Sequence, residues 1–401
     1  MRSSGHWDPV APPPPALVRP LRPDPAGLAG PTPGQAVGRG WRRTSRGFHV
    51  PASVDSEVPE QRLLEQSMRL GRGGAVSGWG SCRLQGAAYF DGRDPTGRRR
   101  PVLLAVGSAG DKLRSDDQAR VSREPLPEQD IVLRVGIRCT TPQRALFDDM
   151  RQLRDWREGV VAFDMMAAAG EVSLAQMLAF AGQHSRWRRS RRVMLALRLG
   201  DERSRSPAET RMRLVWQVDA GLPRPLVNQE IFTLDGRLIG VADLFDPVAG
   251  LVGEYDGADH LRVVRRSRDM FREEAFRRVG LEYVDAVGPD LRDRRRLADR
   301  IRSTRSRGRF AAPKDRRWSI QPPPGWRREQ SLDERLFLRE MAAAGERDLS
   351  TRAVERSRAI ADGSTAMSFH SSPGAGSDGW RTGAGVASGA DSQAFDQGAA
   401  R

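Results

Sequence analysis

Glycine and proline gather toward the two ends of this 401-residue chain, and this distribution limits where a folded core can form. Residues 1–30 contain the run Pro12–Pro15 and show no hydrophobic periodicity, and the chain beyond residue 306 runs into a tail rich in glycine, serine and alanine. Segments of this composition bury too little apolar surface to offset the entropy of ordering them. We therefore expect disordered tails over 1–30 and 306–401, with one short helix, Ser331–Ala344, in the second.

The charge of the chain favours a polyanionic partner. Basic residues outnumber acidic ones by 66 to 51, and all of the 66 except Lys112 and Lys314 are arginine. Codon bias alone can produce such a composition. Whatever the origin of this arginine content, guanidinium groups bind phosphates through two hydrogen bonds and stack on bases. Nucleic acid, and DNA first, is the expected partner.

Several protein classes are excluded by what the sequence lacks. Two cysteines, Cys82 and Cys139, form neither a disulfide framework nor a four-thiolate zinc site. The five histidines never fall four residues apart, which excludes an HExxH metallohydrolase. No run of about 18 apolar residues is present, and prolines stand where a signal peptide needs an apolar segment. We expect a cytoplasmic protein with neither a membrane partner nor a small-molecule cofactor.

The middle of the chain predicts an α+β protein built from two blocks. The first block, 31–182, opens with the short segment Trp41–Pro51 and continues with short apolar strands. It ends with two amphipathic helices, Pro142–Leu153 and Glu158–Ala169. An arginine-rich linker or helix, 183–203, leads to the second block.

The second block, 204–305, has the predicted order α-β-β-β-α-β-α around a central mixed sheet. Its first helix starts at the capping box Ser206–Glu209, where Pro207 takes the first helical position. Asp235-Gly236 is a typical hairpin turn between the first two strands. The expected strands are 226–234, 237–245, 251–256 and 281–287, and the expected later helices are 264–279 and 290–303.

Acidic residues on two neighbouring strands form the candidate chemical site. If the intervening loop is centred near Val248, Asp243 faces Glu254 across the hairpin, and strand periodicity puts Asp256 on the face of Glu254. Opposed carboxylates destabilise a sheet unless a cation lies between them, and such oxygen ligands suit Mg²⁺ or Mn²⁺. The same pattern also fits two acids on a solvated sheet face.

Two further residues lie within reach of this strand end. His260 follows Asp256 by four residues, and Glu209 stands in the first turn of the preceding helix. His260 could move a proton, and Glu209 could orient ligands. Each also has a simpler interpretation, His260 as a loop histidine and Glu209 as the acid of the capping box.

Across Ser206–Ile301 the sequence resembles the Vsr-like, very-short-patch-repair branch of the PD-(D/E)XK nuclease superfamily. The matching segments are Ser-Pro-Ala-Glu-Thr (206–210), Gly-Val-Ala-Asp-Leu (240–244), Glu-Tyr-Asp-Gly-Ala-Asp-His (254–260), Arg268-Asp269 and Gly-Leu-Glu-Tyr-Val (280–284). The resemblance implies a restriction-endonuclease-like fold in which Asp243 and Glu254 hold a divalent metal and Asp256 stands where the superfamily has lysine. It also implies that His260 assists and that Glu209 matches the acid of the family's first helix.

The first block resembles the AbiEi-type antitoxin domain that accompanies such a nuclease-like domain in actinobacterial proteins. The similarity lies in Pro33–Gln35, Trp41–Pro51, Ser77–Trp79, Leu84–Ala87 and Thr141–Asp148. It implies a winged-helix-like region that binds DNA, and it adds a nucleotidyltransferase-type toxin as an expected partner. The stretch before Trp41, where the leading helices of a winged helix belong, is rich in proline and glycine.

Two groups of arginines are the candidate nucleic-acid contacts. They are Arg42, Arg43 and Arg46 in the wing-like segment and Arg188, Arg189, Arg191 and Arg192 in the linker. Each group also fits an ordinary solvated surface.

The sequence therefore predicts a Mg²⁺-dependent DNA endonuclease with an accessory DNA-binding region. The alternative is a non-catalytic, antitoxin-like regulator that binds DNA and uses the nuclease fold as a binding platform.

Overall fold

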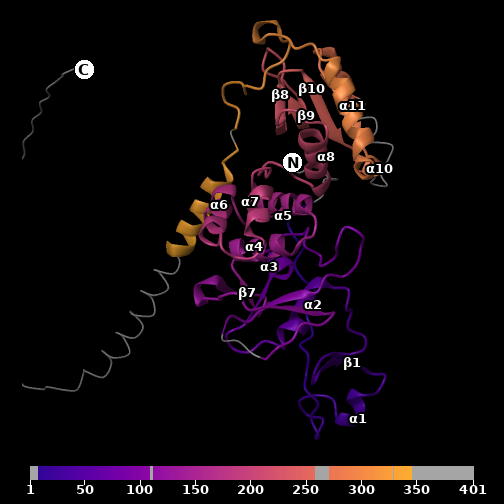
Figure 1. Ribbon diagram of the computed structural model, residues 1–401, viewed down its shortest axis with the longest axis vertical. Coiled ribbons are helices and arrows are strands. Elements are labelled where there is room, and N and C mark those ends of the chain that lie inside the picture. Colours follow the sequence, from indigo (N-terminus) through magenta and orange to yellow (C-terminus); the bar gives the residue numbers. More distant parts are fainter. Residues whose placement is uncertain (1–7, 109–111, 258–270, 328, 346–401) are drawn as a thin grey trace, which may run out of the picture. The chain divides into compact units, whose positions relative to one another are not determined.

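The structure is a computed structural model that describes residues 8–108, 112–257, 271–327 and 329–345. The chain divides into two compact units, and the larger one, Met1–Met341, contains all the sheets of the described residues. Helices and mixed sheets make the fold α+β, as expected (Figure 1). None of the helices in the described ranges combines the length and the apolar composition that crossing a bilayer requires.

The first block is built on a five-stranded sheet in the order β5-β4-β3-β7-β6. Its central strand β3 runs antiparallel to β4 and parallel to β7, so the sheet is mixed. The strands are β3 (Ala75–Ser77), β4 (Val102–Ala105), β5 (Ala119–Ser122), β6 (Ile131–Arg134) and β7 (Ile137–Thr140). The strands β3 and β4 coincide with the short apolar strands that the sequence predicts around Ala75–Trp79 and Val102–Val106. The other three carry an arginine within four residues and show no clear alternation.

Helices pack on this sheet around buried aromatic side chains, including Trp79, Phe147 and Phe163. The helices are α2 (Pro59–Ser67), α3 (Gly78–Leu84), α4 (Pro142–Gln152), α5 (Trp156–Ala168), α6 (Leu174–Gln183) and α7 (Ser190–Leu197). Proline is the first residue of both α2 and α4. A backbone N–H at this position has no partner within the helix, so the helix loses no hydrogen bond when proline, which lacks the N–H, stands there. The predicted helix pair corresponds to α4 and α5.

The second block holds a four-stranded sheet in the order β11-β10-β9-β8. Strands β8, β9 and β10 are antiparallel neighbours, and β11 joins β10 in parallel. The elements are α8 (Pro207–Leu214), a π-helical turn (Val215–Asp219), β8 (Leu226–Phe232), β9 (Leu238–Asp246), β10 (Leu251–Tyr255), a helix over 271–278, β11 (Glu282–Ala286), α10 (Gly288–Arg292) and α11 (Arg294–Ser306). The described elements follow the predicted order, but the last helix is interrupted at Asp293, which caps α11.

Helices cover both faces of this second sheet. Helices α8 and α11 lie on one face (Figure 1). There Trp216, in the turn after α8, packs with Leu297 of α11. On the other face, Phe276 of the helix over 271–278 packs with Phe245 of β9 and Val252 of β10. Side chains of β9 and β10 that share the face of Phe245 and Val252 therefore point toward the helix over 271–278.

Residues 8–30, for which composition predicts disorder, make defined contacts. Leu21 and His49 exchange both backbone hydrogen bonds, each 2.8 Å long. The side-chain amide of Gln61 both donates to and accepts from the backbone of Val18, at 2.9 Å each. The expectation of disorder is corrected for this stretch, because an extended proline-rich chain can order by hydrogen bonding to a folded neighbour.

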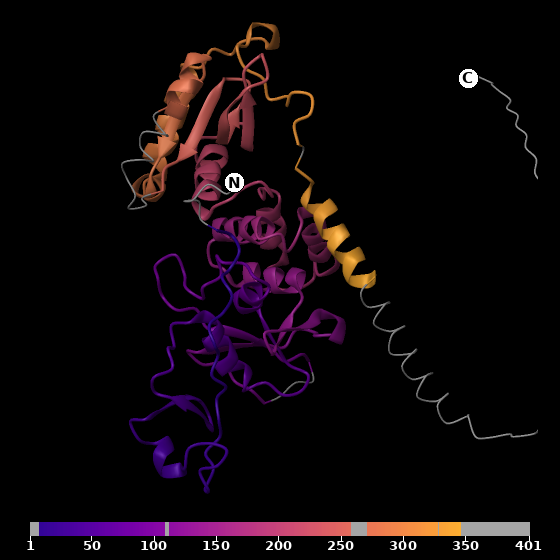
Figure 2. The same cartoon turned by 180° about the vertical axis from the view of Figure 1, so that it is seen from behind.

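The chain after α11 is also ordered in part. Residues 332–341 are helical (Figure 2). Leu332 and Leu336 of this helix are buried in the core of the first block. Leu338 and Met341 on the same helix are exposed. The predicted helix is present, and the disorder expected from residue 306 onward is corrected for this segment.

The segment expected to be a wing forms an antiparallel hairpin. Its strands are β1 (Trp41–Ser45) and β2 (Phe48–Pro51), and Gly47 in the turn has φ +77°, which favours glycine. Ahead of it, within residues 8–40, the helical element is α1 (Pro33–Ala36), a single turn capped by Thr32. The hairpin is present, but residues 8–40 do not form the leading helices of a winged helix-turn-helix.

A fully buried ion pair joins the two blocks. Asp164 of α5 and Arg213 of α8 are both 0% exposed, and Arg213 donates to the Asp164 carboxylate at 2.6 Å. The carboxylate also accepts from the backbone N–H of Asp201 (2.8 Å) and from the hydroxyl of Thr210 (2.7 Å). Burial raises the pKa of Asp164, while Arg213 opposes that change. These hydrogen bonds offset part of the cost of removing two charges from water.

Breaking this pair should destabilise the protein strongly. Arg213→Met leaves a buried, unpaired carboxylate and should lower the free energy of unfolding by about 3–5 kcal/mol, measured by urea denaturation. The matched control is Arg211→Met on the same helix, which removes a partly exposed pair with Glu158 and should cost about 1 kcal/mol or less. Adding Asp164→Asn to Arg213→Met should recover part of the loss. Equal losses for the two single variants would contradict this account.

Candidate functional site

The candidate acids lie where strands β9 and β10 part. The antiparallel register pairs Gly253 with Leu244, so Glu254 and Asp243 come next in the ladder. Backbone pairing ends before them, and the carboxylate of Asp243 accepts a hydrogen bond from the backbone N–H of Tyr255 at 2.9 Å. The register therefore brings the two acids to opposed positions at the end of the paired region.

Glu254 is 3% exposed and is paired with an arginine. Its carboxylate accepts a hydrogen bond from the guanidinium of Arg272, in the helix over 271–278. Gly240 of β9 lies beneath this helix, where a Cβ atom would come within 2.9 Å of the Phe276 ring and 3.3 Å of the Arg272 side chain. A glycine at this position lets the helix approach the sheet closely enough to bring Arg272 to Glu254.

Glu209 of α8 is buried and held by several hydrogen bonds. Its carboxylate accepts from the side-chain amide of Asn228 and from the backbone N–H of Arg205, both at 2.9 Å. Its own N–H donates to the hydroxyl of Ser206 at 3.2 Å, which is the capping contact expected from the sequence. Glu209 has a second effect besides capping, because its negative charge raises the pKa of Asp243.

The environment of Asp243 favours its protonated form. Burial is the main cause that raises its pKa to about 7, and the charge of Glu209 raises it further. The hydrogen bond from Tyr255 and the charges of Arg272 and Arg205 act in the opposite direction. A buried carboxyl group that titrates near neutral pH beside another carboxylate is typical of sites that bind cations or move protons.

Of the other predicted site residues, Asp256 is not part of this buried group. Asp256 lies just past β10 and is exposed, with its backbone N–H donating to the carbonyl of Ala286 at 2.8 Å. His260 lies outside the described residues. In the described part of the chain, no group of three or more His, Cys, Asp or Glu side chains is arranged to hold a metal ion. The described oxygen donors for a cation at this site are therefore Asp243 and Glu254.

The three arginines of the wing-like segment differ in their contacts and in their exposure. Arg42 makes two hydrogen bonds to the carboxylate of Glu65, at 2.8 and 3.0 Å, so its guanidinium holds β1 to α2. Arg43 and Arg46 are exposed. Of this group, the structure leaves Arg43 and Arg46 available for a phosphate contact.

The linker arginines lie before α7 and in its first turn. Arg188, Arg189 and Arg191 are exposed, whereas Arg192 is half-buried and donates to the carbonyl of Arg154 at 2.5 Å. Arg188 and Arg189 line a groove of the first block. The sequence groups these four residues together, but the structure gives them different surroundings.

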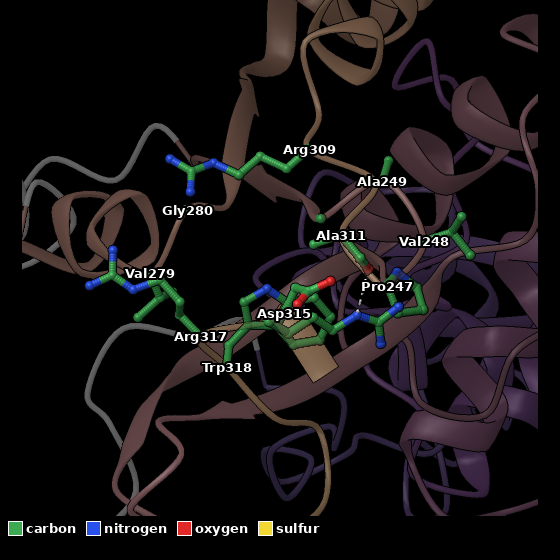
Figure 3. Close-up of a pocket in the computed structure, with 12 residues that line it drawn as sticks. Pro247, Val248, Ala249, Val279, Gly280, Arg309, Ala311, Asp315, Arg317 and Trp318 are labelled. Carbon is green, nitrogen blue, oxygen red and sulfur yellow. Dashed lines mark hydrogen bonds between the residues drawn. The ribbon is translucent and has the colours of Figure 1, made fainter. Parts of the chain in front are cut away.

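A small cavity at the turn of the β9–β10 hairpin is separate from the acids (Figure 3). The turn residues Pro247–Gly250 line it together with Trp318, and its volume is about 20 Å³. Such a volume holds about one water molecule, and neither Asp243 nor Glu254 lines it. The cavity is therefore too small to accept a substrate.

Sequence patterns alone did not identify two residues of this site. Arg272 could have been found from its four-residue spacing to Phe276, since that apolar residue marks the inward face of the helix. Asn228, which binds Glu209, has φ +45° within β8. Nothing in the alternation of a strand predicts this backbone conformation.

Comparisons with models of protein families, with curated proteins and with solved structures each find no match for this chain. The chemistry of the site must therefore be inferred from its own geometry.

The raised pKa of Asp243 predicts how stability changes with pH in the absence of metal. Between about pH 4 and pH 7 the folded state binds a proton that the unfolded state has released, so stability should fall as the pH rises. The slope is about 1.4 kcal/mol per pH unit for one such group. Asp243→Asn should remove this component, so the variant gains stability relative to the wild type toward pH 8, measured by urea denaturation in EDTA.

The control for this profile is Asp256→Asn, at an exposed acid just past the same strand. Its profile should follow that of the wild type, since water solvates this side chain in both the folded and the unfolded state. Parallel profiles for the wild type and Asp243→Asn would show that burial does not act on Asp243 as described.

Proposed function

We propose that the protein is a divalent-metal-dependent DNA endonuclease that hydrolyses phosphodiester bonds at a Vsr-like, PD-(D/E)XK-type site and binds DNA through an accessory region. The observation that carries this proposal is the opposed placement of Asp243 and Glu254 where β9 and β10 part. Like charges in such positions cost stability, and local violations of folding rules are expected at functional sites. The α-β-β-β-α-β-α order supports the same fold family.

The donor chemistry fits Mg²⁺ or Mn²⁺. Mg²⁺ is usually bound by one or two carboxylates and keeps its other positions for water and substrate phosphate oxygens. Asp243 and Glu254 would supply two such carboxylates. When bound, the ion would polarise the phosphate and lower the pKa of a water molecule.

The neighbouring residues have roles that follow from their contacts. Glu209, fixed by Asn228, keeps a negative charge near Asp243 and so favours a cation there. Arg272 positions Glu254 and brings a guanidinium, the group best suited to phosphate, beside the acids. In this proposal His260 moves the proton and Asp256 orients ligands from the exposed end of β10.

A non-catalytic, antitoxin-like regulator that binds DNA is the second candidate. The observation that favours it is the ion pair between Glu254 and Arg272, since this pair gives Glu254 a cation from within the chain. In this alternative the nuclease fold is a binding platform, and the expected partner is a nucleotidyltransferase-type toxin.

Metal binding is testable without a DNA substrate. A ligand that binds only the folded state raises stability by about 2.7 kcal/mol at a hundredfold excess over Kd. Mn²⁺ should therefore raise the Tm of the wild type, and Asp243→Asn should abolish that shift. Asp299→Asn, at an exposed acid of α11, is the control and should keep the wild-type shift. An equal shift in all three proteins would eliminate the metal site.

A DNA-cleavage assay distinguishes the endonuclease from the non-catalytic regulator. With supercoiled DNA and Mg²⁺ or Mn²⁺, the wild type should nick, and Glu254→Gln should reduce the rate by at least about 10²–10³-fold, as losses of electrostatic stabilisation commonly do. Gel shifts should show that Glu254→Gln still binds DNA, because removing a negative charge does not weaken contact with a polyanion. Nicking by the variant at the wild-type rate would place the active site elsewhere. A wild type that binds one operator tightly and cuts nothing would favour the regulator.

A further inference from the structure

A groove of about 590 Å³ lies on the first block, and five of its twelve lining residues are arginine. None of the lining residues belongs to the second block, so the groove does not include the candidate acids. Its apolar lining residues are Leu103 and Val121. Pockets for small organic ligands are lined mainly by apolar and aromatic side chains, so this composition points to a polyanion instead.

Two segments far apart in the sequence supply the exposed arginines of the groove. Arg120 lies in β5 and Arg123 just after it, whereas Arg188 and Arg189 precede α7. All four are exposed. Neither Arg120 nor Arg188 makes a side-chain hydrogen bond or ion pair with any residue in the described ranges. Their guanidinium groups therefore remain available to a ligand.

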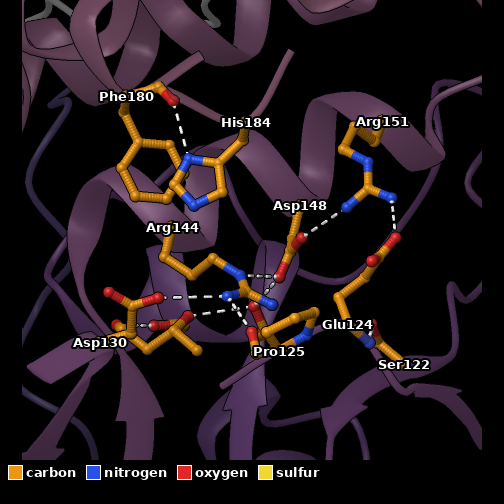
Figure 4. Close-up of polar contacts among 12 residues, drawn as sticks. Ser122, Glu124, Pro125, Asp130, Arg144, Asp148, Arg151, Phe180 and His184 are labelled. Atoms are coloured by element: carbon orange, nitrogen blue, oxygen red, sulfur yellow. Dashed lines mark hydrogen bonds and ion pairs between the residues drawn. The ribbon is translucent and has the colours of Figure 1, made fainter. Parts of the chain in front are cut away.

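The acids in the groove are already neutralised from within the fold. Arg151 donates to Asp148 at 3.2 Å and to Glu124 at 2.6 Å, and Arg144 donates to Asp148 at 2.8 Å (Figure 4). Arg144 is fully buried behind this contact. The carboxylates thus balance Arg151 and Arg144 rather than Arg120 or Arg188.

The same network fixes the segment that carries Arg188 and Arg189. The side chain of Arg151 donates to the carbonyl of Arg188 at 2.7 Å, and the Trp187 ring packs against the guanidiniums of Arg144 at 4.4 Å and Arg151 at 5.2 Å. Arg189 has φ +66°, a backbone conformation that is uncommon for residues other than glycine. A strained residue held by such contacts suggests a surface with a binding role.

We propose that this groove binds the phosphodiester backbone of DNA through Arg120, Arg123, Arg188 and Arg189. Guanidinium groups match phosphate oxygens bidentately, and contacts of this kind position a duplex without reading its sequence. The groove extends the predicted linker contacts to a second segment, 120–123, and it leaves Arg191 outside the binding surface. This binding requires neither a metal ion nor the carboxylates of the second block.

Salt-dependent binding tests the groove directly. A short fluorescein-labelled duplex of random sequence is titrated with full-length protein in EDTA, where no cleavage occurs, and affinity is followed by fluorescence anisotropy at several salt concentrations. Each phosphate contact contributes about 0.9 to the slope of log Kobs against log [salt]. Arg120→Gln/Arg188→Gln should therefore flatten the slope by about 1.8.

The matched control is Arg191→Gln/Arg198→Gln. It removes the same charge from exposed positions of the neighbouring helix that do not line the groove. It should change the slope by less than about half as much, since neither residue lines the groove and neither should contact a phosphate bound in it. Equal effects of the two pairs, or no effect of the groove pair, would overturn the proposal.

The outcome of this binding test can be distinguished from the outcome of the nuclease test. Loss of slope in the groove pair together with a wild type that never nicks DNA would support the groove and reject the enzyme. Normal DNA binding by the groove pair together with metal-dependent nicking would reject the groove alone. The unfolding midpoint of each pair, measured in the same buffer, shows whether a change in binding reflects loss of fold.

Discussion

The buried ion pair between Asp164 and Arg213 determines where helix α8 lies, and the candidate site depends on that helix. Asp164 belongs to the first block and Arg213 to the second, so the pair fixes α8 to α5. Glu209 precedes Arg213 by four residues, about one turn of the same helix. A well-packed apolar pair could stabilise this contact equally well. The ion pair adds direction, because its hydrogen bonds allow one rotation of α8 and thereby set the position of Glu209.

Arginine serves as an internal counterion in many parts of this fold, and the net charge therefore overstates the surface available to nucleic acid. Three ion pairs each join an arginine to a buried acid: Arg144 with Asp148, Arg100 with Asp149, and Arg42 with Glu65. Guanidinium suits this role because its planar fork satisfies a carboxylate with little loss of conformational freedom. A count of arginines in the sequence cannot separate those that neutralise buried acids from those that face a ligand. The structure makes that separation.

Strand spacing and turn chemistry predicted the second block well. The turn at Asp235-Gly236 joins β8 to β9, and the loop centred near Val248 sets the register of β9 with β10. A one-residue slip in that register would have moved Asp243 to the opposite face. The spacing therefore predicted the opposed acids. The spacing of Arg272 to Phe276 marks it as facing the sheet, but its contact with Glu254 could not be predicted, because that contact depends on how closely the helix approaches β9 at Gly240. The order in residues 8–30 was missed for a related reason, since it depends on partners such as Gln61 that are distant in sequence.

The site tolerates its acids by a different physical means for each one. Glu254 is compensated by the guanidinium of Arg272, and Glu209 by the amide of Asn228 together with a backbone N–H. Among the residues that the structure describes, Asp243 accepts one backbone N–H bond, from Tyr255, and no guanidinium bond, and burial raises its pKa to about 7. Burial therefore keeps the Asp243 carboxyl group protonated to a higher pH than an exposed aspartate. Because a cation that approaches must displace this proton, cation affinity at the site should increase with pH. In the proposed metal site, the charge state of Asp243 would therefore govern cation binding.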